Sequence, residues 1–98
     1  MLVHTVFFWL DPQLGAAQRA EFEMRLNKLT TISAVSHVFT GVPSATNRPV
    51  IDRTYSYGLT LIFENLAKHD EYQVDPLHQE FIEKCHAMWL KVTIYDFE

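Results

Sequence analysis

The chain has 98 residues, of which 48% are hydrophobic and 13% aromatic, and it carries a formal net charge of -4. This length predicts one domain over residues 1–98, and the apolar share excludes a disordered protein. No basic cluster is present, which argues against a nucleic-acid partner because phosphate binding needs concentrated positive charge. No apolar run approaches the ~20 residues of a membrane span. A single cysteine, Cys85, excludes an internal disulfide, so we expect a cytoplasmic protein.

The first predicted element is a strand over residues 2–10, a stretch rich in Val, Phe, Thr and Trp. Its alternate positions are apolar on both faces, which is typical of a strand covered on both sides. One face carries Leu2, Val6, Phe8 and Leu10, and the other carries Val3, Phe7 and Trp9. His4 shares the face of Val6 and Phe8, where a lone histidine is more often a satisfied core residue than a ligand or a base.

A helix is predicted over about residues 13–30, because Phe22, Leu26 and Leu29 fall on one face at helical spacing. A second strand follows over residues 34–41.

Residues 42–53 contain two prolines and predict a surface loop before a third strand over 54–63. Gly58, in the middle of that strand, suggests a bulge or the close approach of another group. Asn65 is placed to cap a short helix that runs to about Val74.

The dipeptide Asp75-Pro76 predicts a break between two helices. Pro76 disfavours helical geometry at Asp75, whereas Asp75 at the N-cap and Pro76 at the first position start a new helix well. We expect that helix to run to about residue 90, and a last strand to cover 91–97.

The predicted order is therefore strand, helix, strand, strand, helix, strand, which is the ferredoxin-like βαββαβ pattern of an α+β protein. It predicts a four-stranded antiparallel sheet with the helices on one face. The other face would be bare although its residues are apolar. Two sheets packing face to face in a homodimer would cover it.

His78 is the leading candidate for chemistry. It falls near the third position of the helix that starts at Pro76, where the positive end of the helix dipole favours a neutral imidazole, the form that a general base needs. Ile82, Cys85 and Trp89 follow on the same predicted face and place His78 at the end of an apolar stripe. The alternative is that His78 only hydrogen-bonds the preceding turn or a neighbouring strand.

Tyr72 lies before the break, and on an unbroken helix it would face away from His78. The break lets the two side chains converge, and a tyrosine there could donate to a substrate carbonyl and stabilise an enolate. Alternatively, Tyr72 is an aromatic residue at the edge of the core. His4 and Tyr57 would join the pair if their strand faces border the same cavity.

Metal and cofactor chemistry is not expected. The five histidines match no compact ligand motif, and His69 and His86 are expected on solvated helix faces. Cys85 fits a buried small hydrophobe better than a nucleophile. The chain has only three glycines and no glycine-rich phosphate loop, so no cofactor is predicted.

Three short motifs and the element order resemble the stress-responsive A/B barrel (Dabb) family over essentially the whole chain. The motifs are His4-Thr5-Val6-Phe7, Asp75-Pro76-Leu77-His78 and Asp96-Phe97. The resemblance implies a dimeric α+β barrel in which two sheets close around a shared centre and the helices lie outside. Most members of the family have no known role, and some are linked to stress responses.

A few plant relatives in this family are polyketide cyclases that form an aromatic acid by intramolecular aldol condensation. For those enzymes, the resemblance implies that residues matching His78 and Tyr72 act as base and partner, and that one matching His4 lines the site. At a third-strand position where they carry histidine, this chain has Tyr57.

Three hypotheses follow. The leading one is a Dabb protein that binds a small apolar or aromatic molecule between helices and sheet, through Phe8, Tyr57, Ile82 and Trp89, with no activity assigned. The second is a cofactor-free cyclase, lyase or isomerase, with His78 as base, Tyr72 as donor and His4 as an orienting group. The third is a structural dimer module whose histidines are satisfied core residues.

Overall fold

The computed structural model describes residues 1–98 and contains one antiparallel sheet and three α-helices. The elements are β1 (Leu2–Leu10), α1 (Ala16–Lys28), β2 (His37–Gly41), β3 (Tyr57–Phe63), α2 (Leu66–Val74), α3 (Pro76–Cys85) and β4 (Trp89–Phe97), with 3-10 turns at Leu29–Thr31 and His86–Met88. The strand order is β2-β3-β1-β4. This is the predicted ferredoxin-like α+β arrangement, with β1 in the middle of the sheet between β3 and β4.

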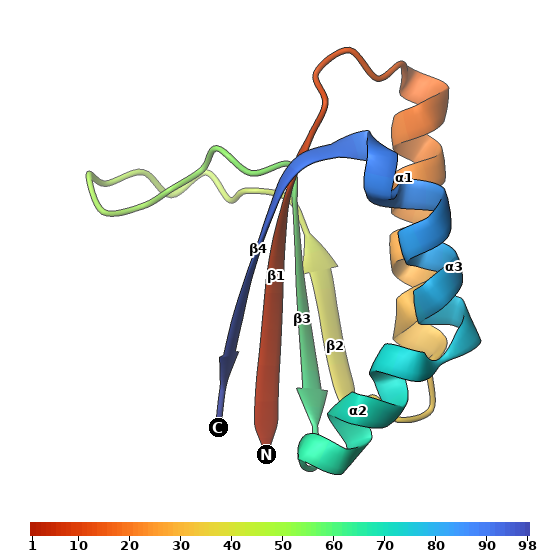
Figure 1. The fold of residues 1–98 in the computed structure, drawn as a ribbon. Helices are drawn as coiled ribbons and strands as arrows, with labels where there is room; N and C mark the ends of the chain where they lie inside the picture. Colours follow the sequence, from red (N-terminus) through yellow and green to blue (C-terminus); the bar gives the residue numbers. More distant parts are fainter.

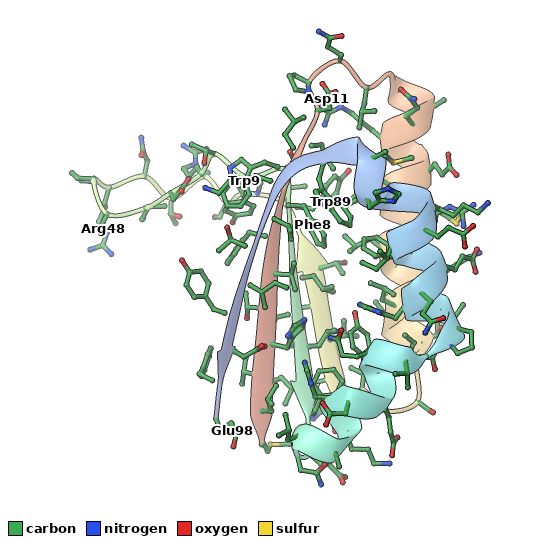
Figure 2. All side chains as sticks on the ribbon, viewed as in Figure 1. Phe8, Trp9, Asp11, Arg48, Trp89 and Glu98 are labelled. Atoms are coloured by element: carbon green, nitrogen blue, oxygen red, sulfur yellow. The ribbon has the colours of Figure 1, made fainter.

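All three helices cover the same face of the sheet, and the opposite, bare face carries no helix (Figure 1). Successive side chains of β1 point alternately to the helix-covered face and to the bare face of the sheet. Phe8 points to the helices and is 3% exposed, whereas Trp9 points to the other side (Figure 2). The register of β1 against β3 pairs Leu2 with Phe63 and Val6 with Leu59, so both strands turn apolar residues toward the helices.

The core lies between this face of the sheet and the helices. Phe22, Leu26 and Leu29 form the buried side of α1 and the following turn, as predicted. On α3, however, the buried residues are Phe81 and Cys85. Cys85 is thus buried as predicted, but Phe81 takes the inward position predicted for Ile82, which is 40% exposed at the border of the core.

The ends of the helices and strands differ from the prediction where local hydrogen bonds decide them. Helix α1 begins only at Ala16, because the backbone of Gly15 serves as the N-cap and donates to Oε1 of Gln18 at 3.0 Å. The strand predicted over 34–41 is shortened at its start, since the amide of Val35 closes a turn onto the carbonyl of Ile32 at 3.1 Å.

The last helix is shorter than predicted, and β4 begins at Trp89. The amide of Asp11 donates to the carbonyl of Met88 at 2.8 Å, which joins the end of the second 3-10 turn to the end of β1. Trp89 is therefore a strand residue and not the last turn of a helix.

The segment between β2 and β3 extends away from the sheet on the side opposite the helices, with Arg48 near its tip (Figures 1 and 2). Its base is fixed to β1. Nε1 of Trp9 donates to Oγ1 of Thr54 at 2.8 Å, and the amide of Ser56 donates to the carbonyl of Phe8 at 2.7 Å. No helix of the protein is long and apolar enough to cross a membrane.

Candidate functional site

A cavity of about 160 Å³ opens between the sheet and helices α2 and α3. Ten of its 13 lining residues are hydrophobic. The lining residues are His4, Val6, Phe8, Leu29, Leu59, Tyr72, Gln73, His78, Phe81, Ile82, Trp89, Val92 and Ile94. Such a wall, mostly apolar with a few polar groups, is typical of small-molecule sites.

The break between α2 and α3 brings Tyr72 and His78 together. Asp75 ends α2 and also caps α3, where its Oδ1 accepts a hydrogen bond from the amide of Leu77 at 2.8 Å. Because the chain changes direction at this residue, the rings of Tyr72 and His78 lie with their centroids 4.7 Å apart and tilted by 57°. Both rings line the cavity, so the predicted convergence is present.

Tyr72 provides a hydroxyl that is free to donate. Its ring packs against Phe63 at a centroid distance of 5.3 Å, and the residue is only 1% exposed. Every fully buried polar side-chain atom of the protein has a hydrogen-bond partner. The Tyr72 hydroxyl has none within the protein, so its oxygen is not fully buried and is accessible from the cavity that Tyr72 lines. Burial, and to a smaller degree the charge of Asp75, raise the pKa of Tyr72, which keeps the phenol protonated.

His78 is held in its neutral form. Burial is the main cause that lowers the pKa of this imidazole, and the nearby His4 lowers it further. A hydrogen bond to the backbone carbonyl of Gln73 and the charge of Asp75 raise the pKa and partly offset this effect. The position of His78 in the first turn of α3 acts in the same sense as burial, since the positive helix end disfavours a second positive charge. A neutral imidazole and a protonated phenol therefore face one cavity.

His4 is fixed by a residue on the neighbouring strand. It is 4% exposed and lies directly opposite Asp96 in the register of β1 and β4, and its Nδ1 is hydrogen-bonded to Oδ1 of Asp96. Because a carboxylate only accepts, Nδ1 carries the proton and Nε2 keeps its lone pair. Burial lowers the pKa of His4 although the bond to Asp96 opposes this effect.

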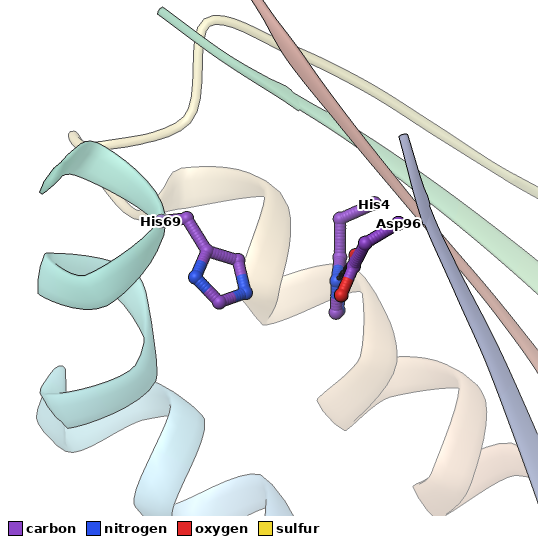
Figure 3. A group of neighbouring side chains, drawn as sticks. All are labelled: His4, His69 and Asp96. Carbon is purple, nitrogen blue, oxygen red and sulfur yellow. Dashed lines mark hydrogen bonds and ion pairs between the residues drawn. The ribbon is translucent and has the colours of Figure 1, made fainter. Parts of the chain in front are cut away.

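His69 lies beside this pair, which overturns its prediction as a solvated residue (Figure 3). Its ring centroid is 5.2 Å from that of His4 and 5.6 Å from that of Phe63, and its side chain is 16% exposed. His69 precedes Tyr72 by one helical turn, so both face the sheet. That spacing was visible in the sequence. His86, by contrast, is exposed as predicted.

Three of the four predicted ligand contacts lie at the cavity. Phe8 and Trp89 meet at its aromatic end, with centroids 5.3 Å apart, and Ile82 lies at its edge. Sequence reasoning missed Phe81, which stacks on Trp89 at 5.9 Å. The apolar end and the polar end of the cavity are thus built from different residues.

Tyr57 does not line this cavity. Its hydroxyl donates to Oε2 of Glu23 at 2.9 Å, and its ring packs beside Phe22 at 5.3 Å. It shares the helix-facing side of β3 with Leu59 but lies at the start of the strand, where α1 covers it. Tyr57 is therefore tied to α1 and lies outside the cavity.

This geometry defines an α+β protein of the ferredoxin-like type with a small pocket between its helices and its sheet. Solved structures with this fold include a Dabb family protein from Mesorhizobium loti, at 24% sequence identity and a TM-score of 0.79, covering 99% of this chain and 94% of that one. A hydroxynitrile lyase from Passiflora edulis has 18% identity and a TM-score of 0.79, covering 98% and 90%. A dimeric ferredoxin-like protein of unknown function from Thermobifida fusca has 15% identity and a TM-score of 0.79, covering 98% and 88%.

The family itself is settled by the sequence. The model of the stress responsive A/B barrel domain, Dabb, matches residues 2–98, and the chain belongs to this family. A comparison with curated proteins found no match. Family membership leaves the activity of this chain unassigned, because unrelated functions share one fold.

Proposed function

We propose that this Dabb protein binds a small, mostly apolar carbonyl compound in the cavity and transfers a proton at the carbon next to the carbonyl. One observation carries the proposal: the neutral imidazole of His78 and the free hydroxyl of Tyr72 lie together in the wall of a mostly apolar pocket. Burial of these groups strengthens their interaction with a ligand, because the local dielectric is low.

The chemical step uses only the residues of the chain. The imidazole of His78 takes a proton from the carbon beside the carbonyl, and the electron pair of the broken C–H bond forms an enolate. The hydroxyl of Tyr72 donates a hydrogen bond to the enolate oxygen, where negative charge develops. His4, fixed by Asp96, orients the polar end of the ligand. The apolar end would lie against Phe8 and Trp89.

Two precedents support an activity on this scaffold. The Passiflora edulis protein with the same fold is a hydroxynitrile lyase. The resemblance to plant polyketide cyclases also assigns roles to the positions of His78 and Tyr72. The bond between Tyr57 and Glu23 argues for a different substrate from that of the cyclases.

Deuterium exchange tests the proposal directly. Small ketones with an aryl or alkyl chain are incubated with the protein in D2O containing a chelator, and loss of the proton signal beside the carbonyl is followed by NMR. We expect faster exchange than in buffer and loss of that gain in His78→Gln. The control is His86→Gln, an exposed histidine near the end of the same helix segment. Exchange that persists in His78→Gln would contradict the proposal.

A binding function without chemistry has its own outcome. If ligands raise the melting temperature of the protein but do not exchange their protons, the protein binds such compounds without catalysing the reaction. If no member of the ketone panel binds or exchanges, the carbonyl-compound proposal fails and the structural-module hypothesis is favoured.

We also propose that the chain forms a homodimer through the bare sheet face. Phe39, Tyr95 and Phe97 are 67%, 61% and 59% exposed, and all three lie on that face. Several solved proteins with this fold are described as dimeric. Burial of this apolar surface against a second copy is the expected result.

A cytoplasmic location is proposed on the state of the cysteine. Cys85 is free and buried, and burial raises the pKa of its thiol to about 11. A protein without disulfide bonds is suited to a reducing compartment. Fractionation of the source cells tests this, and recovery in an extracellular fraction would contradict it.

A further inference from the structure

We propose that His4, His69 and Asp96 form a binding site for a divalent transition-metal ion of the zinc type. Each residue offers one ligand atom, and these three atoms lie within 4.8 Å of one another (Figure 3). Two imidazoles and one carboxylate are a donor set that suits Zn²⁺ and its neighbours in the first transition row.

The three ligands come from three different elements that are firmly placed. His4 and Asp96 are directly opposite each other on β1 and β4, and His69 reaches them from α2. Ligand atoms on one tetrahedral ion are about 3.3 Å apart, as bond lengths of about 2.0–2.1 Å require. The cluster reaches this spacing if Asp96 and His69 rotate their side chains, which are 46% and 16% exposed.

His69 also has the supporting contacts that metal-bound histidines show. Its Nδ1 lies 3.2 Å from Oδ1 of Asp70, which leaves Nε2 with a lone pair. Nε2 of Gln73 lies 3.4 Å from Nε2 of His69, a long contact that an ion would replace. A carboxylate behind a histidine ligand fixes its tautomer and raises its basicity.

The hydrogen bond between His4 and Asp96 holds two ligands side by side before an ion arrives. An ion bound by Nδ1 of His4 would take the place of the shared proton, which would move to Nε2 of the same ring, so that Nδ1 and the carboxylate of Asp96 both face the ion. The exposed side of Asp96 gives a path from solvent. Because His4 also lines the cavity, a bound ion would lie at the polar end of the proposed ligand pocket. Three protein ligands would leave the fourth position of a tetrahedral ion open toward that pocket.

Metal titration of the whole, tag-free protein tests this inference. Zn²⁺ binding is measured by calorimetry, and Co²⁺ binding by its visible absorption, which reports tetrahedral coordination. We expect one ion per chain, and binding at least about tenfold weaker in His69→Gln and in Asp96→Asn. His86→Gln is the matched control, because His86 is exposed and its Nδ1 bonds the carbonyl of Ile82 at 2.9 Å.

Substitution of the buried His4 would perturb the core, so the role of His4 as a ligand is tested in the unsubstituted protein by NMR. In an NMR titration with Zn²⁺, the ring nitrogens of His4 and His69 are expected to shift, whereas those of His37 and His86 keep their positions. Absence of stoichiometric binding would overturn the proposal. So would binding that is unchanged in both ligand variants or equally weakened in His86→Gln. The exchange assay contains a chelator, so the two proposals fail independently.

Discussion

The two faces of the sheet both carry large aromatic side chains, but their surroundings are opposite. On the helix-covered face, Phe8 and Phe63 are 3% and 0% exposed, and Phe8 lines a cavity that also carries the polar groups of His4, Tyr72, Gln73 and His78. On the bare face, Phe39 and Phe97 are more than half exposed. Apolar character alone therefore does not separate a ligand site from an interface. On the covered face, the cavity between the sheet and the helices brings together the polar side chains of His4, Tyr72 and His78.

The largest difference is expected in folding stability. Phe22→Ala removes a fully buried ring that contacts Phe8 and Phe81 at centroid distances of 5.3 and 5.7 Å. We expect a loss of ~3–5 kcal/mol in the free energy of unfolding. Phe39→Ala, on the bare face, should change the free energy of unfolding of the monomer by less than about 0.5 kcal/mol. Urea denaturation at high dilution measures both, and equal losses would remove the distinction between the faces.

The second difference concerns self-association. Phe97→Asp places a charge on the bare face, where a second copy would desolvate it. We expect the dimer dissociation constant to rise at least about 100-fold, as measured by sedimentation. Leu66→Asp is the control, because Leu66 is 55% exposed at the start of α2 on the helix side. A monomeric unsubstituted protein, or equal weakening by both variants, would refute the interface.

The third difference separates two tyrosines on the helix side. Tyr72→Phe removes a hydroxyl that faces the cavity, and we expect the rate of proton exchange on a bound ketone to fall at least about tenfold. Tyr57→Phe removes a hydroxyl that bonds Glu23 outside the cavity and should leave the rate unchanged. NMR exchange rates compare the two variants. If both rates fall together, the loss reflects general stability and not the position of the hydroxyl.

Local patterns predicted much of this molecule because the relevant contacts are local. Alternation in β1 predicted both sheet faces, and Asp75-Pro76 predicted the helix break that joins Tyr72 to His78. His4 and Asp96 belong to two separate sequence motifs, and nothing in either motif predicts that the two residues pair. Its contact spans 92 positions and depends on the register of β1 against β4. No local pattern shows such a register.

The errors have the same origin. His69 was predicted in solvent because α2 was treated without its partner in the sheet, whereas its helical spacing from Tyr72 turns it inward. Tyr57 was predicted at the cavity because its strand face is correct, but its position along the strand places it under α1. Faces follow from periodicity, and position along a face follows from how the elements pack.

The smallest effect is expected from pH, and it belongs to the covered face. His78 faces Tyr72, His4, His69 and Asp75, and burial lowers its pKa; the pKa of His4 is lowered for the same main reason. The folded state thus binds these protons less readily than the unfolded chain, so stability is greatest above the ordinary histidine pKa of about 6.5 and falls as pH decreases below it.

Urea denaturation at pH 7.5 and at pH 5 measures this loss. We expect His78→Gln to reduce the pH dependence, because it removes one of the two imidazoles whose pKa is lowered in the folded protein. His86→Gln, a change at an exposed ring, is the matched control. A pH dependence that is the same in His78→Gln as in the unsubstituted protein would show that His78 is not held neutral by the fold, and would weaken its assignment as the base of the covered face.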